Sequence, residues 1–305
     1  MFAFLIRRLL SVVAVVVAVT ALVFSVFYAF RPERIADGTG YPHQLARFLE
    51  RAFLHLDLGR SWDRQLSSRP VVDLLREGLP ADVSLVAGGV LVGAAAGIAL
   101  GAVAASGRRG SLMGRALDGF AAFGMSAPVY WVGAMAVLFF HPEVGSIAHL
   151  PISSPNSYEP LTREPLAWLG SLWLPWIILG LPLAAITMRM MRASLGETLD
   201  EDFVRTARGK GLSPARVMRR HAVPAASSPV LSLVGVSMGT VVTNAILLEH
   251  TFSIPGIFAL TTRALGEADL PVIEGVAIAG ALLVVLANLA ADVLHAWVDP
   301  RVREG

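Results

Sequence analysis

Long apolar runs separated by shorter polar segments form the main pattern of this sequence. Each of six runs is about 20 residues long, the length that an α-helix needs to cross the hydrocarbon core of a bilayer. The runs lack the two-residue alternation of transmembrane β-strands, so only helices can satisfy their backbone groups in lipid. The pattern therefore predicts an all-α membrane protein with six transmembrane helices, at residues 9–30, 81–105, 117–140, 169–188, 230–248 and 272–298.

The basic residues predict how these helices are oriented, because cytoplasmic loops carry an excess of arginine and lysine. If the N-terminus is cytoplasmic, so is the segment between the fourth and fifth runs. This segment holds eight of the 25 basic residues, between residues 189 and 220. The two short outer loops then hold one arginine each, Arg163 and Arg263. We therefore expect a multi-pass protein with both termini in the cytoplasm.

The composition agrees with a membrane protein and excludes several other classes. Hydrophobic residues make up 55% of the chain and charged residues only 16%. A net charge of +2 is too small to indicate nucleic-acid binding, so the expected surroundings are a lipid bilayer. Because the chain has no cysteine, disulfides and thiolate metal sites are excluded.

The part before residue 81 is expected to form a separate domain. Residues 1–80 would hold the first span and a long outer segment, and residues 81–305 a core of five helices. In the outer segment an apolar stripe predicts an amphipathic helix that lies on the membrane surface or packs over the helix bundle. The stripe and the glycine expected to end the helix are Leu45, Phe48, Leu49, Ala52, Phe53, Leu56 and Gly59.

Glycines and prolines mark features inside the spans. Gly89, Gly93, Gly97 and Gly101 recur every four residues, so they form one smooth ridge that another helix can approach closely. We expect that neighbour in the same subunit, with a dimer interface as the alternative. Kinks are predicted at three prolines of the third and fourth runs, Pro128, Pro175 and Pro182.

The sequence offers little for catalysis. A G-x-S-x-G pattern occurs at residues 235–239, but it falls inside an apolar run and not at a strand-to-helix turn. We interpret it as helix packing; the competing hypothesis is an intramembrane hydrolase that uses Ser237. No P-loop motif and no histidine pattern typical of a metal site occurs. We therefore expect no catalytic residue, cofactor or metal on this chain.

Polar residues inside the spans are further candidates for function, because burying them in lipid is costly. Asn288 and Asp292 lie four residues apart and His295 three further on, so one face of the last helix is polar. Asn244 adds a polar group in the fifth run. Contacts between helices are the interpretation that we favour. A translocation path lined by Asn244, Asn288 and Asp292, or an ion path at the last helix, is the alternative.

The charged segment 198–224 predicts two short helices between the fourth and fifth runs. Thr198 and Glu201 have the spacing of a capping box, and Leu199, Phe203 and Ala207 would form the apolar stripe of the first helix. So narrow a stripe cannot form a core of its own. The two helices are therefore expected to enter a groove on another protein.

A tight turn is predicted between these two helices. Gly209 and Gly211 would end the first helix, and Ser213 would cap the second with Pro214 at its first position. A hydrophobic staple and a closing proline would complete the unit, at Leu212, Val217 and Pro224.

Three short pieces of this segment carry a family resemblance. Arg205-Thr206-Ala207, then Gly211, then His221-Ala222-Val223-Pro224 resemble the EAA loop of ABC importer permeases, in the dipeptide and oligopeptide branch. Segments 58–61, 69–71, 128–131, 252–256 and 299–301 are also similar to that family. Arg205 stands at the position of the EAA glutamate, so the chain departs here from the wider family, although an arginine is usual in this branch. The chain also lacks the Pro-Gly-Asp-Pro segment common after the first span.

The resemblance implies a type I ABC importer permease fold in a bacterial cytoplasmic (inner) membrane, with cytoplasmic coupling helices and a long outer loop after the first span. The chain would be a non-catalytic subunit that forms half of the translocation path for peptides. Its partners would be a second homologous permease, two ATPase subunits that bind ATP and magnesium, and an extracytoplasmic substrate-binding protein. Nickel or another small solute is the alternative substrate, and an ion-coupled secondary transporter the alternative mechanism.

The resemblance also implies which residues couple the chain to the ATPase subunits. They lie in a coupling loop at residues 192–228 and are Phe203, Arg205, Thr206, Ala207, Gly211, Ser213, Pro214 and Pro224.

Overall fold

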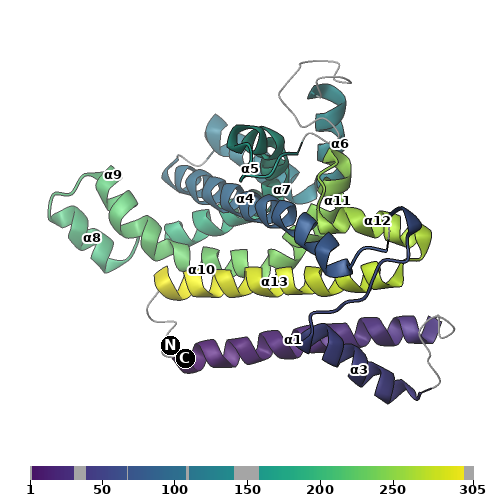
Figure 1. The fold of residues 1–305 in the computed structure, drawn as a ribbon. Coiled ribbons are helices and arrows are strands. Elements are labelled where there is room, and N and C mark those ends of the chain that lie inside the picture. The colour runs from purple at the N-terminus through teal and green to yellow at the C-terminus, as the bar shows by residue number, and fades with distance from the viewer. Residues whose placement is uncertain (1, 31–38, 67, 108–109, 141–157, 299–305) are drawn as a thin grey trace. The chain divides into compact units, whose positions relative to one another are not determined.

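Helices make up nearly all the regular structure of this protein. The computed structural model describes residues 2–30, 39–66, 68–107, 110–140 and 158–298 (Figure 1). Within these ranges no β-strand occurs, and one isolated bridge pairs Arg60 with Pro70. The predicted all-α fold class is confirmed.

Six stretches can cross a membrane by length and composition. Four are single helices: α1 (Phe2–Phe30), α4 (Val71–Ser106), α7 (Pro165–Thr198) and α13 (Leu270–Val298). Two are bent pairs, each counted as one span: α5 (Leu112–Ser126) with α6 (Val129–Phe140), and the run ending in α10 (Val223–Val236) with α11 (Met238–Phe252). The shorter elements are α3 (Tyr41–Leu54), η1 (Arg64–Leu66), α8 (Asp202–Gly209), α9 (Pro214–Val217), η2 (Met218–Ala222) and α12 (Ile257–Glu267). The six predicted runs are all helical, and two of them are bent.

Helices α4 and α7 extend further than the apolar runs predict. Helix α4 begins at Val71 and passes through Pro80, and α7 continues to Thr198. The early start of α4 is stabilised by packing, because Val71 and Leu74 are buried and a Cβ on Gly275 would overlap Val71. An apolar window measures the thickness of the bilayer, so it misses helical turns that protein contacts stabilise beyond it.

Contacts divide the chain into two compact units. The first contains residues 1–83 and 253–286, and the second contains residues 84–252 and 287–305. The chain therefore passes between the units inside α4, at the end of α11 and inside α13. The expected domains, 1–80 and 81–305, follow the order of the chain and stay a prediction.

In the first unit the predicted amphipathic helix is present as α3 and packs on α1. The rings of Phe24 and Phe48 stack with their centroids 5.0 Å apart, and Phe48 is buried. The predicted stripe is too long, however, since Phe53 is 38% and Leu56 66% exposed. Helix α3 ends at Leu54, so Leu56 lies outside the helical repeat.

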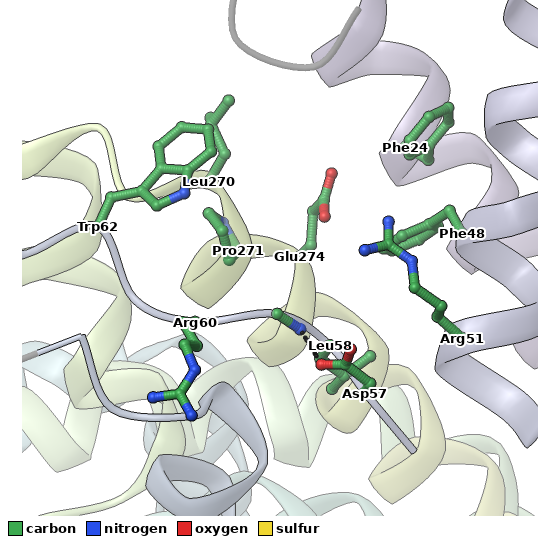
Figure 2. A pocket seen from close by; sticks show the side chains of 11 residues that line it. Phe24, Phe48, Arg51, Asp57, Leu58, Arg60, Trp62, Leu270, Pro271 and Glu274 are labelled. Carbon is green, nitrogen blue, oxygen red and sulfur yellow. Dashed lines mark hydrogen bonds between the residues drawn. The ribbon is translucent and has the colours of Figure 1, made fainter. Parts of the chain in front are cut away.

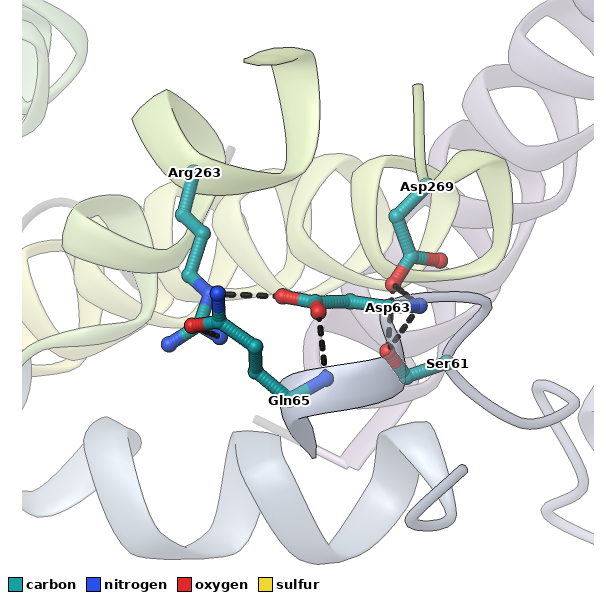
Figure 3. Close-up of polar contacts among 5 residues, drawn as sticks. All are labelled: Ser61, Asp63, Gln65, Arg263 and Asp269. Atoms are coloured by element: carbon teal, nitrogen blue, oxygen red, sulfur yellow. Dashed lines mark hydrogen bonds and ion pairs between the residues drawn. The ribbon is translucent and has the colours of Figure 1, made fainter. Parts of the chain in front are cut away.

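A polar network in the first unit links the outer segment to α12 and the start of α13 (Figure 3). The Asp63 carboxylate accepts hydrogen bonds from Arg263 Nε at 2.6 Å and from the Gln65 N–H at 2.7 Å, while Ser61 donates to Asp269. The Asp63 side chain is only 4% exposed. The Arg263 guanidinium, and then the Gln65 N–H, hold the pKa of this carboxyl below its ordinary value.

In the second unit the glycine ridge of α4 packs against α7. A Cβ built on Gly93 would lie 2.7 Å from the carbonyl oxygen of Gly180, and one on Gly89 would lie 2.7 Å from Leu179 Cδ2. The ridge continues with Gly97 against Thr187 and Gly101 against Met191. No side chain fits on this face, so the expectation of packing within one subunit is confirmed.

Two bends interrupt the spans of the second unit. Helices α5 and α6 meet at 105° where Pro128 was expected to kink the chain, because proline lacks the N–H of a helical hydrogen bond. Helices α10 and α11 meet at 53° at Ser237. Helix α7, by contrast, stays one helix through Pro175 and Pro182.

Candidate coupling site

A hairpin of two short helices, α8 and α9, joins α7 to α10 in the second unit (Figure 1). The two helices pack against each other. They correspond to the charged segment for which two short helices are predicted. We call residues 199–217 the α8–α9 hairpin.

The turn of the hairpin is a Schellman motif with Gly211 at its left-handed position. The Gly211 N–H donates to the Arg208 carbonyl at 2.9 Å, and the Leu212 N–H donates to the Ala207 carbonyl at 3.4 Å. Gly211 has a φ of +79°, a conformation that costs a residue with a Cβ about 1–2 kcal/mol. The predicted tight turn is confirmed, and its left-handed position is the one that requires a glycine, Gly211.

Three buried apolar side chains form a small core inside the hairpin. They are Val204 and Ala207 of α8 and Val217 of α9, and Leu199 and Leu212 pack against them. The contact between Leu212 and this cluster confirms the predicted staple. The expectation that the two helices form no core of their own is wrong, because valines from both helices meet in it.

Two predictions for α8 are also wrong. Thr198 does not cap α8, since α7 continues through Thr198 and Glu201 takes the N-cap position without a side-chain cap hydrogen bond. Phe203 is 45% exposed, whereas Val204 is buried. Residues 199–201 form a turn between α7 and α8, and the face of α8 that meets Val217 carries Val204 and Ala207.

Helix α9 begins as predicted, with Ser213 at the N-cap and Pro214 in the first turn. The Ser213 carbonyl accepts from the N–H groups of Arg216 and Val217 at 2.9 and 3.0 Å. Its side chain makes no cap hydrogen bond. Ser213 therefore starts this helix through its backbone carbonyl, and its hydroxyl does not contribute.

Pro224 does not close the hairpin, which corrects another prediction. Helix α9, the π-turn Met218–Ala222 and α10 form one helical run from Pro214 to Val236. The Val223 N–H donates five residues back to the Met218 carbonyl. Pro224 follows directly in the first turn of α10, where its missing N–H is tolerated.

The hairpin is mounted on the ends of two spans through a second apolar cluster. Met191 and Leu195 of α7 pack with Ala222, Ala226 and Val230. The Ser194 hydroxyl also donates to the Ala226 carbonyl at 3.0 Å. Leu199 packs against both this cluster and the hairpin core. Packed side chains thus connect the hairpin to both α7 and α10.

The surface of the hairpin is exposed and carries charges of both signs: four basic residues, Arg205, Arg208, Lys210 and Arg216, and three acidic ones, Asp200, Glu201 and Asp202. Arg205 lies 3.7 Å from Asp202, an exposed pair that contributes about 0–1 kcal/mol at most. The Thr206 hydroxyl donates to the Asp202 carbonyl at 2.9 Å. These groups therefore add little to the stability of the hairpin and can contact a partner. The other exposed residues of the hairpin include Phe203, Ser213 and Pro214, and the exposed Arg219 and Arg220 follow in the π-turn.

A separate cavity of about 200 Å³ brings Asn244 together with Ser237 and Thr240. These three polar residues are spaced i, i+3 and i+7 across the bend between α10 and α11. They face Pro182 and Leu183 of α7 across the cavity. Sequence reasoning singled out Asn244 but missed Thr240, although its spacing from Asn244 was the signal.

Asn288 is not among the described residues that line this cavity. Asn288 is half-buried in α13, and the side chains of Asp292 and His295 lie outside the described residues. Ser237 lies at a helix bend and donates to the Leu233 carbonyl at 2.8 Å, so it is not inside an unbroken helix as expected. Within the described ranges no group of three His, Asp or Glu side chains is arranged to hold a metal.

The fold and the hairpin define a class of protein: an all-α membrane protein in which a compact, exposed hairpin is mounted on two spans. Comparison with known families makes the assignment specific. The chain belongs to the family of binding-protein-dependent transport system inner membrane components, whose profile matches residues 97–304. This range contains the hairpin and the spans that carry it.

Known proteins are similar over most of the chain. A Brucella abortus (strain 2308) protein named as a peptide transport system permease is 35% identical over 260 residues, which cover 85% of this chain and 79% of the relative. A peptide ABC transporter permease of Sinorhizobium fredii (strain NBRC 101917 / NGR234) is 33% identical over 234 residues, covering 77% and 72%. The dipeptide transport system permease protein DppB of Escherichia coli (strain K12) is 32% identical over 269 residues, covering 82% and 78%.

Proposed function

We propose that this chain is the membrane-spanning permease subunit of an ATP-driven importer and forms half of a translocation path for peptides. The α8–α9 hairpin carries the proposal, because it is a compact, exposed knob packed onto the ends of two spans. A knob of this kind suits the transfer of movement from a partner protein into the membrane. The names of the relatives support peptides as the substrate.

The proposed complex has the partners implied by the family. A second permease completes the path, two ATPase subunits bind ATP and magnesium, and a substrate-binding protein delivers the peptide outside. The chain itself is non-catalytic and binds no cofactor. Both termini and the hairpin lie on the cytoplasmic side, as the excess of basic residues between 189 and 220 supports.

The cavity at Asn244 is the part of the chain that we propose to line the path. It joins Ser237, at the bend that follows α10, and polar groups of α11 to α7, and the hairpin is mounted on α7 and α10. A movement of the hairpin would therefore change the width of the cavity. This connection gives the coupling a physical route through two helices.

Two variants of the hairpin test this function in membranes that contain the whole complex. Gly211→Leu strains the left-handed turn, and Ala207→Asp places a charge in the buried hairpin core. Both are expected to lower uptake of a labelled dipeptide at least tenfold and to weaken co-purification of the ATPase subunits, while the chain stays in the membrane. Gly209→Leu is the matched control, since Gly209 is two residues away, helical and open.

The control is expected to keep most of the uptake. Unchanged uptake together with unchanged co-purification in both hairpin variants would overturn the coupling role. Uptake that continues without any ATPase partner and stops when the proton gradient is dissipated would instead support a secondary transporter.

A further inference from the structure

A pocket in the first unit encloses a buried carboxylate. It has a volume of about 280 Å³ and is lined by α1, α3, the segment at residues 57–62 and the start of α13 (Figure 2). Glu274 of α13 points into the pocket and is only 7% exposed. The pocket is separate from the hairpin and from the cavity at Asn244, and the proposed function gives Glu274 no task.

The Glu274 carboxylate has no hydrogen-bond or ion-pair partner among the described residues. Arg51 of α3 lines the same pocket and points toward Glu274, but it lies beyond ion-pair distance (Figure 2). A buried carboxylate is costly unless a cation or hydrogen-bond donors compensate it. An ionisable side chain within a membrane span therefore indicates a site for a ligand or partner group.

The walls of the pocket favour an organic cation. Phe24, Phe48 and Trp62 surround the space in front of Glu274, and aromatic faces attract ammonium groups. The other carboxylate of the pocket, Asp57, already accepts a hydrogen bond from the Gly59 N–H at 2.9 Å. One free carboxylate is too few for calcium or magnesium, which need about six oxygen ligands, whereas an ammonium group with three donors can pair with it.

Arg51 adds a second requirement on the ligand. Its guanidinium reaches into the pocket from α3, beyond ion-pair distance from Glu274, and offers donors in a fork that matches carboxylate or phosphate groups (Figure 2). A simple cation would be repelled by Arg51. A molecule with an ammonium group and a nearby anionic group satisfies both side chains.

We propose that this pocket binds a zwitterionic molecule with a primary ammonium group, which pairs with Glu274, while its anionic group pairs with Arg51. Two sources share this chemistry: the ends of a short peptide or amino acid, and the phosphoethanolamine headgroup of a membrane lipid. Both α1 and α13 are long enough to cross a membrane, which makes a lipid headgroup one of the two candidate ligands. The proposal does not depend on the coupling role of the hairpin.

The test uses the full chain with its co-purifying partners in nanodiscs of phosphatidylglycerol. One arm adds phosphatidylethanolamine or its N-acetylated form, and the other adds di-alanine or N-acetyl-di-alanine. Retained lipid is measured by native mass spectrometry and peptide binding by calorimetry. We expect at least one free amine to bind, its N-acetylated form to bind at least tenfold more weakly, and the arm that binds to identify the source.

Glu274→Gln is expected to weaken that binding at least tenfold, and Glu267→Gln, at an exposed position of α12, to leave it unchanged. Arg51→Gln, also at an exposed position, should weaken binding of the zwitterion at least threefold. Binding of ethylamine, which has no anionic group, should not fall in this variant. Absence of binding by both amines, or equal binding to wild type and Glu274→Gln, would overturn the proposal.

A rival explanation is an internal ion pair in which Arg51 swings onto Glu274. The two explanations differ in the ligand-free protein. An internal pair predicts that Glu274→Gln lowers the thermal unfolding temperature, because it leaves Arg51 without its partner. A ligand site predicts an unchanged or raised unfolding temperature, because an uncompensated buried charge is removed. A lowered temperature without amine binding would establish the rival.

Discussion

Replacement of Gly93 by alanine tests the close contact between α4 and α7. The added Cβ would lie 2.7 Å from the Gly180 carbonyl oxygen and 3.0 Å from the Gly180 Cα. Both are backbone atoms, so no flexible side chain can move aside and the helices have to separate. Gly196→Ala is the matched control, because Gly196 is exposed on α7 and a Cβ there meets nothing within 4 Å.

The two substitutions are expected to have opposite effects on stability. Alanine in place of glycine stabilises a helix by about 0.5–1 kcal/mol, which is the whole effect at Gly196. At Gly93 overpacking costs about 1–3 kcal/mol, so after subtraction of the helix gain the net destabilisation is about 0–2.5 kcal/mol. This corresponds to a fall of at most about 10 °C in unfolding temperature, because 1 kcal/mol shifts chains of 150–250 residues by about 2–4 °C and longer ones by less.

Tryptophan fluorescence during heating in nanodiscs measures this effect. Trp176 reports on the contact itself, since its Nε1 donates to the Ser84 carbonyl across it at 2.8 Å. Wild type and both variants are compared at equal protein and lipid concentrations. An unfolding temperature for Gly93→Ala equal to or above that of Gly196→Ala would refute the role of the glycine ridge.

Two further predictions concern the polar network and the hairpin turn. The pKa of Asp63 in the folded protein lies below its ordinary value, so the ionised carboxylate stabilises the fold above about pH 4, and this stabilisation is lost as the pH falls further. Asp63→Asn should therefore remove part of the acid-induced fall in unfolding temperature, measured from pH 6 to 3. Gly211→Ala should destabilise the hairpin by about 1–2 kcal/mol, seen as faster hydrogen exchange of the Leu212 amide, whereas Gly209→Ala should not accelerate it. Equal acid sensitivity of wild type and Asp63→Asn would contradict the first prediction. Equal exchange rates of the Leu212 amide in Gly211→Ala and Gly209→Ala would contradict the second.

The features predicted well from the sequence are those with a local cause. The spans follow from the length of the apolar runs, and the turn of the hairpin follows from Gly211 and Pro214. The ridge at Gly89–Gly101 needed only the four-residue repeat, because a helix face without side chains is a property of one segment. Each of these signals lies within about 25 residues.

The features that were missed depend on contacts between distant segments. Thr198 has a good capping pattern, but α7, with Leu195 and Leu199 packed at its end, includes Thr198 as its last residue. Phe203 is more apolar than its neighbours, yet the position of α9 selects Val204 for the hairpin core. The pocket at Glu274 is built from residues 24 to 274, so no local pattern could indicate it.

The π-turn at Met218–Ala222 sets the rotational phase between the hairpin and the span that follows it. Each residue of an α-helix turns the chain by about 100°, so one residue more or less in this turn would swing the hairpin around the axis of α10 by about a quarter of a circle. The exposed side of α8 would then face a different direction, although every helix could still form. In the run from Pro214 to Val236, the number of residues is therefore as important as their identity.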